Sequence, residues 1–344
     1  MACHFFHPHL GGVERHVWQV AQELQTRGYE VEILTTQHQA DLAQEEVLQG
    51  IKVHRFVLPQ PEAKWRLFKT WLQLARFWRL FAQAEIIHVH DVMIWLLPWR
   101  LLFFRKKFIL TMHGWEGIFP IPKKNIFFKK LSAWLANKVI CVGDYIEKYY
   151  RVKADKVIFG GVDKKWLIDE KKITKKHQFK PGEKVQLLYV GRLAEDTGLP
   201  GLLKILPLIP EEKLEVIFAG DGALRAKCEK YGQVLGWQTA PQLQSLLHQA
   251  QLCFVGGYLS ALEAMAAGCL ALASFQHQLK KDYWQLGQMS DWVICGQPAQ
   301  LQKKIEQYLA APGGFGTQVK SNYQQVKEMS WERVSELYEG FYDK

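Results

Sequence analysis

The chain has 344 residues, 48% of them hydrophobic and 23% charged, and a formal net charge of +10. These fractions are typical of a globular protein and exclude a disordered or low-complexity chain. The length exceeds that of one ordinary core and predicts two domains of about 150 residues each.

The first half alternates between helix-like and strand-like segments. Apolar residues at helical spacing predict a helix over 13–28, followed by a strand at VEILTT. Further strands are expected at IKVHRFV, EIIHVH, KFILTMH and KVICVG. Strands and helices that alternate in this way predict a parallel sheet with helices on both faces.

The alternation pauses over 164–184, a lysine-rich segment with a Pro-Gly pair that we interpret as a linker. It resumes at VQLLYVG, LEVIFAG, QLCFV, CLALAS and DWVIC. We therefore expect two doubly wound α/β domains, at 1–163 and 185–325. The tail at 326–344 is expected to be an amphipathic helix beginning near Ser330.

The stretch GGYLSALEAMAAG at 256–268 indicates an anion site. Two glycines precede a short helix, and its first turn offers backbone N–H groups. HPHLGGVERH at 7–16 has a similar pair of glycines before a helix, which favours a phosphate or a sugar hydroxyl over an ordinary turn.

Other candidate residues follow strands, where doubly wound sheets bind ligands. His113 ends the strand KFILTM, and Arg192 follows VQLLYVG. The alternatives are a structural histidine and an ordinary surface arginine. AGDG at 219–222 has the alternative of a simple loop.

Short motifs follow one another along the chain in the order GGVERH, TMH, ICVG, GGVD, YVGRL, AGDG, VLGW and ALEAMAAG. In the order of these motifs the chain resembles the retaining nucleotide-sugar glycosyltransferases of family 4. The resemblance covers nearly the whole chain. It implies the GT-B fold, in which two Rossmann-like domains face a cleft and the last helix, at 326–344 here, packs back on the N-terminal domain.

The resemblance also implies roles for individual residues. His113 and Arg192 would be catalytic, with His113 near the reacting sugar and Arg192 on the diphosphate. Glu14 and His16 would lie on the acceptor side, and Glu263 would hold the ribose. The full set implied for the donor is Gly11, Gly12, Arg192, Gly236, Trp237, Gly257, Tyr258, Leu259 and Glu263.

Three departures from the family pattern indicate a divergent subgroup. Val255 stands where the family has a first glutamate, eight positions before Glu263. Thr197 stands where it has a second cation for the diphosphate. The opening strand is shortened to MACHFF.

The predicted function is transfer of a sugar from a UDP- or GDP-linked donor to a lipid-linked or glycan acceptor with retention, as in cell-envelope polysaccharide synthesis. The alternative is a non-catalytic nucleotide-sugar binder or a subunit that needs a partner. An epimerase fits less well. A Rossmann oxidoreductase would need an early GxGxxG, which the sequence lacks. No cofactor or metal is expected.

We also expect contact with an anionic membrane. Residues 99–130 contain eight basic residues and one acid, Glu116, interleaved with large apolar side chains. A charged solvated face is the alternative, and no nucleic-acid module is recognisable. Scattered cysteines and a polar, His-rich opening favour the cytoplasm, at the membrane's cytoplasmic face.

Overall fold

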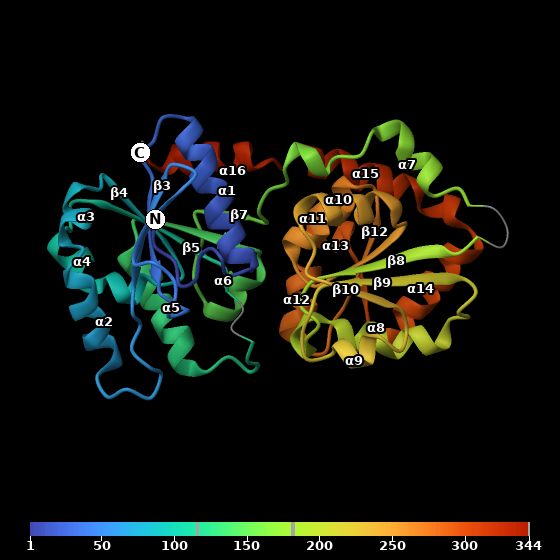
Figure 1. The fold of residues 1–344 in the computed structure, drawn as a ribbon, viewed down its shortest axis with the longest axis horizontal. Helices are drawn as coiled ribbons and strands as arrows, with labels where there is room; N and C mark the ends of the chain where they lie inside the picture. Colours follow the sequence, from blue (N-terminus) through green and yellow to red (C-terminus); the bar gives the residue numbers. More distant parts are fainter. Residues whose placement is uncertain (115–116, 180–182, 343–344) are drawn as a thin grey trace. The chain divides into compact units, whose positions relative to one another are not determined.

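The computed structural model describes residues 1–114, 117–179 and 183–342. Its contacts divide the chain into two units: unit 1 is Met1–Phe159 with the stretch from Trp331 onward, and unit 2 is Gly160–Ser330. Each unit is built on mainly parallel strands covered by helices (Figure 1). The α/β class with two doubly wound domains is therefore confirmed.

The strands of unit 1 form two sets, ordered β1-β3-β2 and β4-β5-β6-β7. Ala2 bridges Leu34 of β1 and Val89 of β4, so the opening segment lies between the sets as a single bridge. The strands are β1 (Glu32–Thr36), β2 (Glu45–Leu48), β3 (Ile51–Phe56), β4 (Ile86–His90), β5 (Lys107–Met112), β6 (Lys138–Val142) and β7 (Lys156–Ile158).

The first helix of unit 1 buries the apolar stripe that its spacing predicts, with Val17, Val20 and Ala21 fully enclosed. The last helix, α16, lies beside it (Figure 1). The helices of unit 1 are α1 (Gly12–Thr26), α2 (Arg66–Ala75), α3 (Trp78–Gln83), η1 (Met93–Leu96), α4 (Leu97–Leu102), α5 (Lys123–Leu135), α6 (Tyr145–Tyr150) and α16 (Trp331–Tyr342).

Unit 2 has one parallel sheet with the order β10-β9-β8-β11-β12-β13. The chain runs outward from β8 through β9 to β10, then returns to β11 and runs the other way. The order therefore reverses between β8 and β11. The strands are β8 (Val185–Val190), β9 (Leu214–Ala219), β10 (Gln233–Gly236), β11 (Leu252–Val255), β12 (Leu270–Ser274) and β13 (Ile294–Gly296).

Helices cover both faces of this sheet, with α8 and α14 on one face and α11 and α15 on the other (Figure 1). The helices of unit 2 are η2 (Lys164–Trp166), α7 (Glu170–Lys176), η3 (Glu195–Thr197), α8 (Leu199–Ile205), η4 (Leu206–Leu208), α9 (Arg225–Cys228), α10 (Ala240–Gln249), α11 (Tyr258–Ala266), α12 (Gln278–Gln285), α13 (Met289–Trp292), α14 (Pro298–Ala310), η5 (Pro312–Phe315) and α15 (Gly316–Lys327).

The segment 164–184, expected as a linker, contributes η2 and α7 to unit 2. Lys171, Lys172 and Lys175 are exposed on α7. Ile168 and Ile173, in contrast, are buried in the core of unit 2, and Lys176 Nζ donates to the Leu247 and Ala267 carbonyls. The chain instead passes between the units at Phe159–Gly160 and Ser330–Trp331. The pair Pro181-Gly182 lies outside the described residues.

Candidate functional site

The reversal of strand order in unit 2 marks the place where a doubly wound sheet binds ligands, beyond the carboxyl ends of the two strands concerned. Here these strands are β8 and β11, which pair side by side from Leu252 opposite Leu187 to Val255 opposite Val190. Arg192 follows β8 and the glycine pair 256–257 follows β11. The structure thus brings the two expected anion-binding elements to one edge of the sheet.

Glycines let the neighbouring loops meet at this edge. Gly220, after β9, has φ +157°, and a Cβ there would lie 1.8 Å from the carbonyl oxygen of Gly191. Gly220 also forms an antiparallel bridge with Gly236, after β10. A side chain at Gly220 would therefore separate the arginine loop from its neighbour.

Arg192 lies in the open, with its side chain 59% exposed. Its Nη2 atom donates to Asp196 Oδ2 at 2.8 Å. An exposed pair of this kind contributes little to stability, so the guanidinium can exchange this partner for a phosphate at small cost.

Helix α11 begins beside this loop. Gly257 is its N-cap, and Tyr258 and Leu259 are in its first turn. The Tyr258 N–H donates to Tyr283 Oη at 2.9 Å, and the two tyrosine rings stack 3.9 Å apart. These two contacts connect the first turn of α11 to α12. Glu263 follows one turn later in α11, with only 3% of its surface exposed.

The turn after β10 presents the expected base-binding pair. Gly236 has φ +72°, which favours glycine, and Trp237 is 52% exposed. The Gln238 amide donates to the Leu235 carbonyl at 2.9 Å and closes the turn. An exposed indole on a closed turn offers a flat surface for a nucleobase.

The sequence analysis missed a cation at this edge, Lys280 on α12. Its Nζ donates to the Gly256 carbonyl at 2.9 Å and lies 4.3 Å from the centre of the Tyr283 ring. Burial lowers the pKa of Lys280 to about 8. Its position in a lysine pair made it resemble ordinary surface charge.

In unit 1, the loop before α1 holds the glycine pair 11–12, and both glycines are exposed. The Glu14 carboxylate folds over this loop, since a Cβ at Gly11 would lie 2.2 Å from Glu14 Oε2. His9 Nδ1 lies 3.0 Å from Glu14 Oε1. Burial raises the pKa of Glu14. The loop therefore has an acid and a histidine paired beside its glycines.

His113 follows β5 and is half-buried. Its backbone N–H lies 3.2 Å from both carboxylate oxygens of Asp91. Its Nε2 lies 3.1 Å from His90 Nδ1. Burial lowers the pKa of His113 to about 4, so the ring is neutral near pH 7 and can exchange hydrogen bonds with sugar hydroxyls.

Asp91 and Lys129 also belong to this centre, and the sequence analysis did not find them. Lys129 Nζ lies 2.6 Å from Asp91 Oδ1. Burial raises the pKa of Asp91, but Lys129 and His113 outweigh it and hold that pKa below its usual value. Asp91 has φ +65°, a strained conformation for a residue other than glycine. Its place directly after the strand EIIHVH is the sequence signal that could have found Asp91.

His16, expected on the acceptor side, faces the interior instead. It is 1% exposed, and its Nε2 lies 2.7 Å from Tyr338 Oη on α16. Its ring meets that of His113 edge to face, with 5.0 Å between centres. His16 therefore positions α16 and His113.

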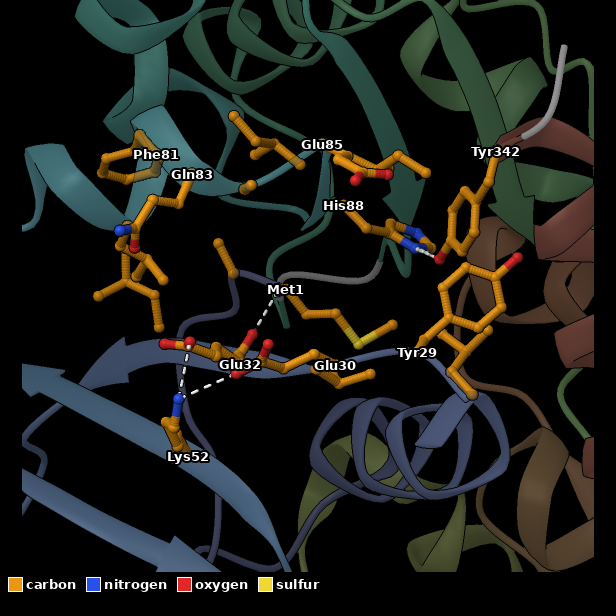
Figure 2. A pocket seen from close by; sticks show the side chains of 18 of the residues that line it. Met1, Tyr29, Glu30, Glu32, Lys52, Phe81, Gln83, Glu85, His88 and Tyr342 are labelled. Carbon is orange, nitrogen blue, oxygen red and sulfur yellow. Dashed lines mark hydrogen bonds and ion pairs between the residues drawn. The ribbon is translucent and has the colours of Figure 1, made fainter. Parts of the chain in front are cut away.

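Unit 1 contains a pocket of about 640 Å³ at the opposite edge of the strands (Figure 2). Glu32 and Ile86, at the amino ends of β1 and β4, line it. Lys52 Nζ lies 3.0 Å from Glu30 Oε1, and the Met1 amino group donates to the Glu32 carbonyl. This pocket is distant from the carboxyl ends of the strands, and these polar groups are paired with one another.

The basic segment 99–130 divides into two kinds of residue. Several expected surface groups are engaged inside unit 1: Trp99 is buried, Lys129 binds Asp91, Arg100 donates to Leu135, Lys106 to Ala84, and Lys107 to Tyr342. The exposed basic and large apolar side chains of the segment include Leu101, Leu102, Phe104, Arg105, Ile118, Phe119, Lys123, Lys124, Phe127, Phe128 and Lys130.

Two family models match the chain, one after the other. "Glycosyltransferase Family 4" matches residues 10–166, and "Glycosyl transferases group 1" matches residues 169–326. The chain belongs to the glycosyltransferases of family 4. The two sites described above therefore lie one in each half of this glycosyltransferase.

Relatives of this glycosyltransferase are identical to it at about a quarter of the aligned positions. The phosphatidylinositol N-acetylglucosaminyltransferase GPI3 subunit of Saccharomyces cerevisiae is 27% identical over 241 residues, which is 64% of this chain and 52% of the relative. The chain thus spans about half the length of that relative. The GDP-mannose:cellobiosyl-diphosphopolyprenol alpha-mannosyltransferase of Xanthomonas campestris is 27% identical over 78% of this chain and 76% of its own.

Among solved structures, Anabaena HepE in complex with UDP and glucose superposes with a TM-score of 0.73 at 15% identity. The match covers 99% of this glycosyltransferase and 97% of HepE. The GT-B fold is thereby confirmed. Among the described residues, no helix is long and apolar enough to cross a membrane, and no three His, Cys, Asp or Glu side chains are grouped to hold a metal.

Proposed function

We propose that the protein transfers a sugar from a UDP- or GDP-linked donor to a lipid-linked or glycan acceptor, with retention at the anomeric carbon. This proposal rests on one observation, the arrangement of side chains and backbone at the edge of the unit 2 sheet where the strand order reverses. There an exposed arginine and the glycine-rich start of α11 flank the place where the diphosphate of a sugar nucleotide would bind.

The proposed donor contacts follow from this placement. Arg192 would pair with the diphosphate, and at the start of α11 (Gly257–Leu259) the diphosphate would replace Tyr283 Oη as the acceptor of the Tyr258 N–H. Trp237 would stack on the base, and Glu263 would accept from the ribose hydroxyls. The bound UDP of HepE and the GDP-mannose in the name of the Xanthomonas relative support a nucleotide diphosphate without choosing the base.

The proposed reaction occurs on one face of the sugar. The bond from the anomeric carbon to the diphosphate oxygen breaks, and the acceptor oxygen bonds to the same face. The acceptor proton passes to the departing diphosphate. Arg192 stabilises the charge that develops there, and the neutral His113 ring holds a sugar hydroxyl. This route needs no metal, so EDTA should leave the rate unchanged.

Thermal unfolding with a panel of nucleotide sugars tests both the proposed class of donor and the identity of its base. One donor should raise the melting temperature, because a ligand that binds the folded state stabilises it. Transfer to a polyprenyl diphosphate sugar, followed by NMR of the anomeric proton, should show the donor's configuration retained. Inversion would contradict the mechanism, and a panel without any stabilising donor would contradict the donor site.

Arg192→Ala should weaken donor binding about tenfold or more, because a charge-assisted hydrogen bond contributes about 1.5–3 kcal/mol. Its stability should stay within about 0.5 kcal/mol of the wild type, since the pair with Asp196 is exposed. Arg333→Ala is the matched control, since it removes an exposed arginine paired within its own helix. Unchanged donor affinity in Arg192→Ala would overturn its assignment.

A second proposal is a subunit that needs a partner, which the name of the yeast relative supports. Donor binding without turnover on any acceptor would favour it. Turnover by the purified chain alone would reject it.

We also propose that unit 1 attaches to an anionic membrane and there meets a lipid-linked acceptor. The exposed part of 99–130 supports this, and so do exposed side chains that the sequence analysis did not include. Trp65 is 80% exposed, Trp78 52% and Trp134 79%. Aromatic side chains beside lysines favour a headgroup region.

Vesicle co-sedimentation tests this attachment. The triple variant Lys123→Glu, Lys124→Glu and Lys130→Glu should lose binding to anionic vesicles, while Lys129 is left intact because it holds Asp91. Glutamate at Lys303, Lys304 and Lys320, all exposed in unit 2, makes the same change in charge and is the control. Equal loss in both triple variants would show a dependence on net charge alone and contradict the proposed surface.

A further inference from the structure

The loop after β8 has no basic side chain at Thr197, where the family resemblance expects the second cation for the diphosphate. Thr197 is 8% exposed. Its hydroxyl donates to the Ala194 carbonyl at 2.8 Å and lies 2.7 Å from Tyr189 Oη. The hydroxyl of Thr197 therefore forms its hydrogen bonds within the protein, and the side chain supplies no positive charge.

Gly256, at the start of the α11 turn, packs directly against this position. A Cβ at Gly256 would lie 3.5 Å from both Thr197 Cβ and Thr197 O. The carbonyl of the same glycine accepts a hydrogen bond from Lys280 Nζ at 2.9 Å. One residue thus connects the position of the missing lysine with a lysine from another element.

We propose that Lys280 supplies the second positive charge for the donor diphosphate, from α12 instead of from the loop after β8. This inference rests on the proposed donor site at the strand reversal. The ammonium lies at the start of α11, where backbone N–H groups and the helix dipole also favour an anion. Arg192 contributes the other charge from the β8 side.

The surroundings of Lys280 hold a positive charge at the start of α11. It is 7% exposed, and its Nζ lies above the face of the Tyr283 ring, where a cation is attracted. Burial opposes its charge and lowers its pKa to about 8. A bound diphosphate would favour the charged form further and gain a contact screened from water.

Binding of nucleoside phosphates tests the inference directly. For the diphosphate that binds, UDP or GDP, Lys280→Met should weaken affinity about tenfold or more, while the affinity for the parent nucleoside stays within about twofold. Lys281→Met, which removes the neighbouring lysine, should leave both affinities unchanged. Equal diphosphate affinity in Lys280→Met and wild type would overturn the role of Lys280 alone. A wild type that binds neither diphosphate would overturn the donor site as well.

The pH dependence separates a charge from a merely structural lysine. The other charged and titratable groups that act on Lys280 are Arg192, Asp196 and Cys295, and Tyr283 lies beside it. Burial raises the pKa of Cys295 to about 12, and that of Tyr283 is raised too. Diphosphate affinity of the wild type should therefore fall as pH rises from 7 to 9.5.

Lys280→Arg should keep diphosphate binding and lose this fall, because arginine stays charged throughout the range. An identical pH profile in Lys280→Arg and wild type would overturn the inference, even if Lys280→Met proved too unstable to measure.

Discussion

At the scale of single residues, two lysines show why a buried charge is hard to recognise in a basic sequence. Lys129 lies in KKNIFFKK and Lys280 in QLKKDYW, and both are the buried member of a lysine pair. Lys130 is exposed, and Lys281 is less enclosed than Lys280. A charge pattern cannot distinguish such neighbours, because the helix turns only one of them inward.

Lys129→Met should lower the free energy of unfolding by about 2–3 kcal/mol, since it leaves the mostly buried Asp91 carboxylate without its cation. Lys130→Met, one residue further along α5, should change it by less than about 0.5 kcal/mol. Urea denaturation measures both values. Similar values for the two variants would show that the pair with Asp91 is not a stabilising contact.

At the scale of elements, the strands with continuous apolar runs were predictable, and the strands that were missed lack such runs. EIIHVH, KFILTM and VQLLYV became β4, β5 and β8, because a buried parallel strand needs a run of apolar residues. The missed strands β2, β7 and β10 have three or four residues and partly exposed side chains. These segments become strands because they pair with a neighbouring strand, and their own sequence does not reveal that pairing.

The contact between α1 and α16 supports a second prediction. Tyr338 Oη lies 2.7 Å from His16 Nε2 and 3.3 Å from Thr111 Oγ1, all buried. Tyr338→Phe removes the partner of His16 Nε2, while Thr111 Oγ1 keeps its contact with His88 Nε2 at 2.8 Å, and should cost about 1–3 kcal/mol of stability.

Tyr231→Phe is the control, because this tyrosine is 38% exposed. Hydrogen exchange should show faster exchange in α1 and α16 of Tyr338→Phe while α11 is unaffected. Unaltered exchange in α1 would contradict a role for this hydroxyl in holding α16.

At the scale of the whole molecule, the sequence predicted the family and the two-domain class, since these depend on the order of motifs over hundreds of residues. The donor-site roles of Arg192 and Glu263 stay predictions. The contacts of Lys280 and Asp91 could not be predicted, because each joins elements distant in sequence. The 164–184 segment was misleading for a related reason: its lysines suggest a linker, whereas Ile168 and Ile173 are buried in unit 2.

The two units should differ in their response to acid. Burial lowers the pKa values of His16, His88 and His90 well below the usual 6.5, and that of His113 to about 4, all in unit 1. Such groups bind protons more readily when unfolded. Their stabilising contribution is therefore present above pH 6.5 and is lost as pH falls from 6.5 toward 4.

Each of these histidines could cost unit 1 up to about 2 kcal/mol at pH 5. In unit 2, burial lowers the pKa of His177 to about 4 in the same way. Hydrogen exchange at pH 7 and pH 5, corrected for the intrinsic rate, should show a greater loss of protection in β4 and β5 than in β8 and β11. Equal losses would contradict the role of these histidines.

The position of α16 has a consequence for how the chain folds during synthesis. His16 and its partner Tyr338 are 322 residues apart, and all of unit 2 is translated between them. At typical translation speeds of about 5–20 residues per second that interval lasts roughly 16 to 64 s, during which the face of α1 that receives α16 has no native cover. Unit 1 therefore cannot complete its fold until α16 has been translated. Chaperones that bind nascent chains should therefore associate with unit 1 for longer.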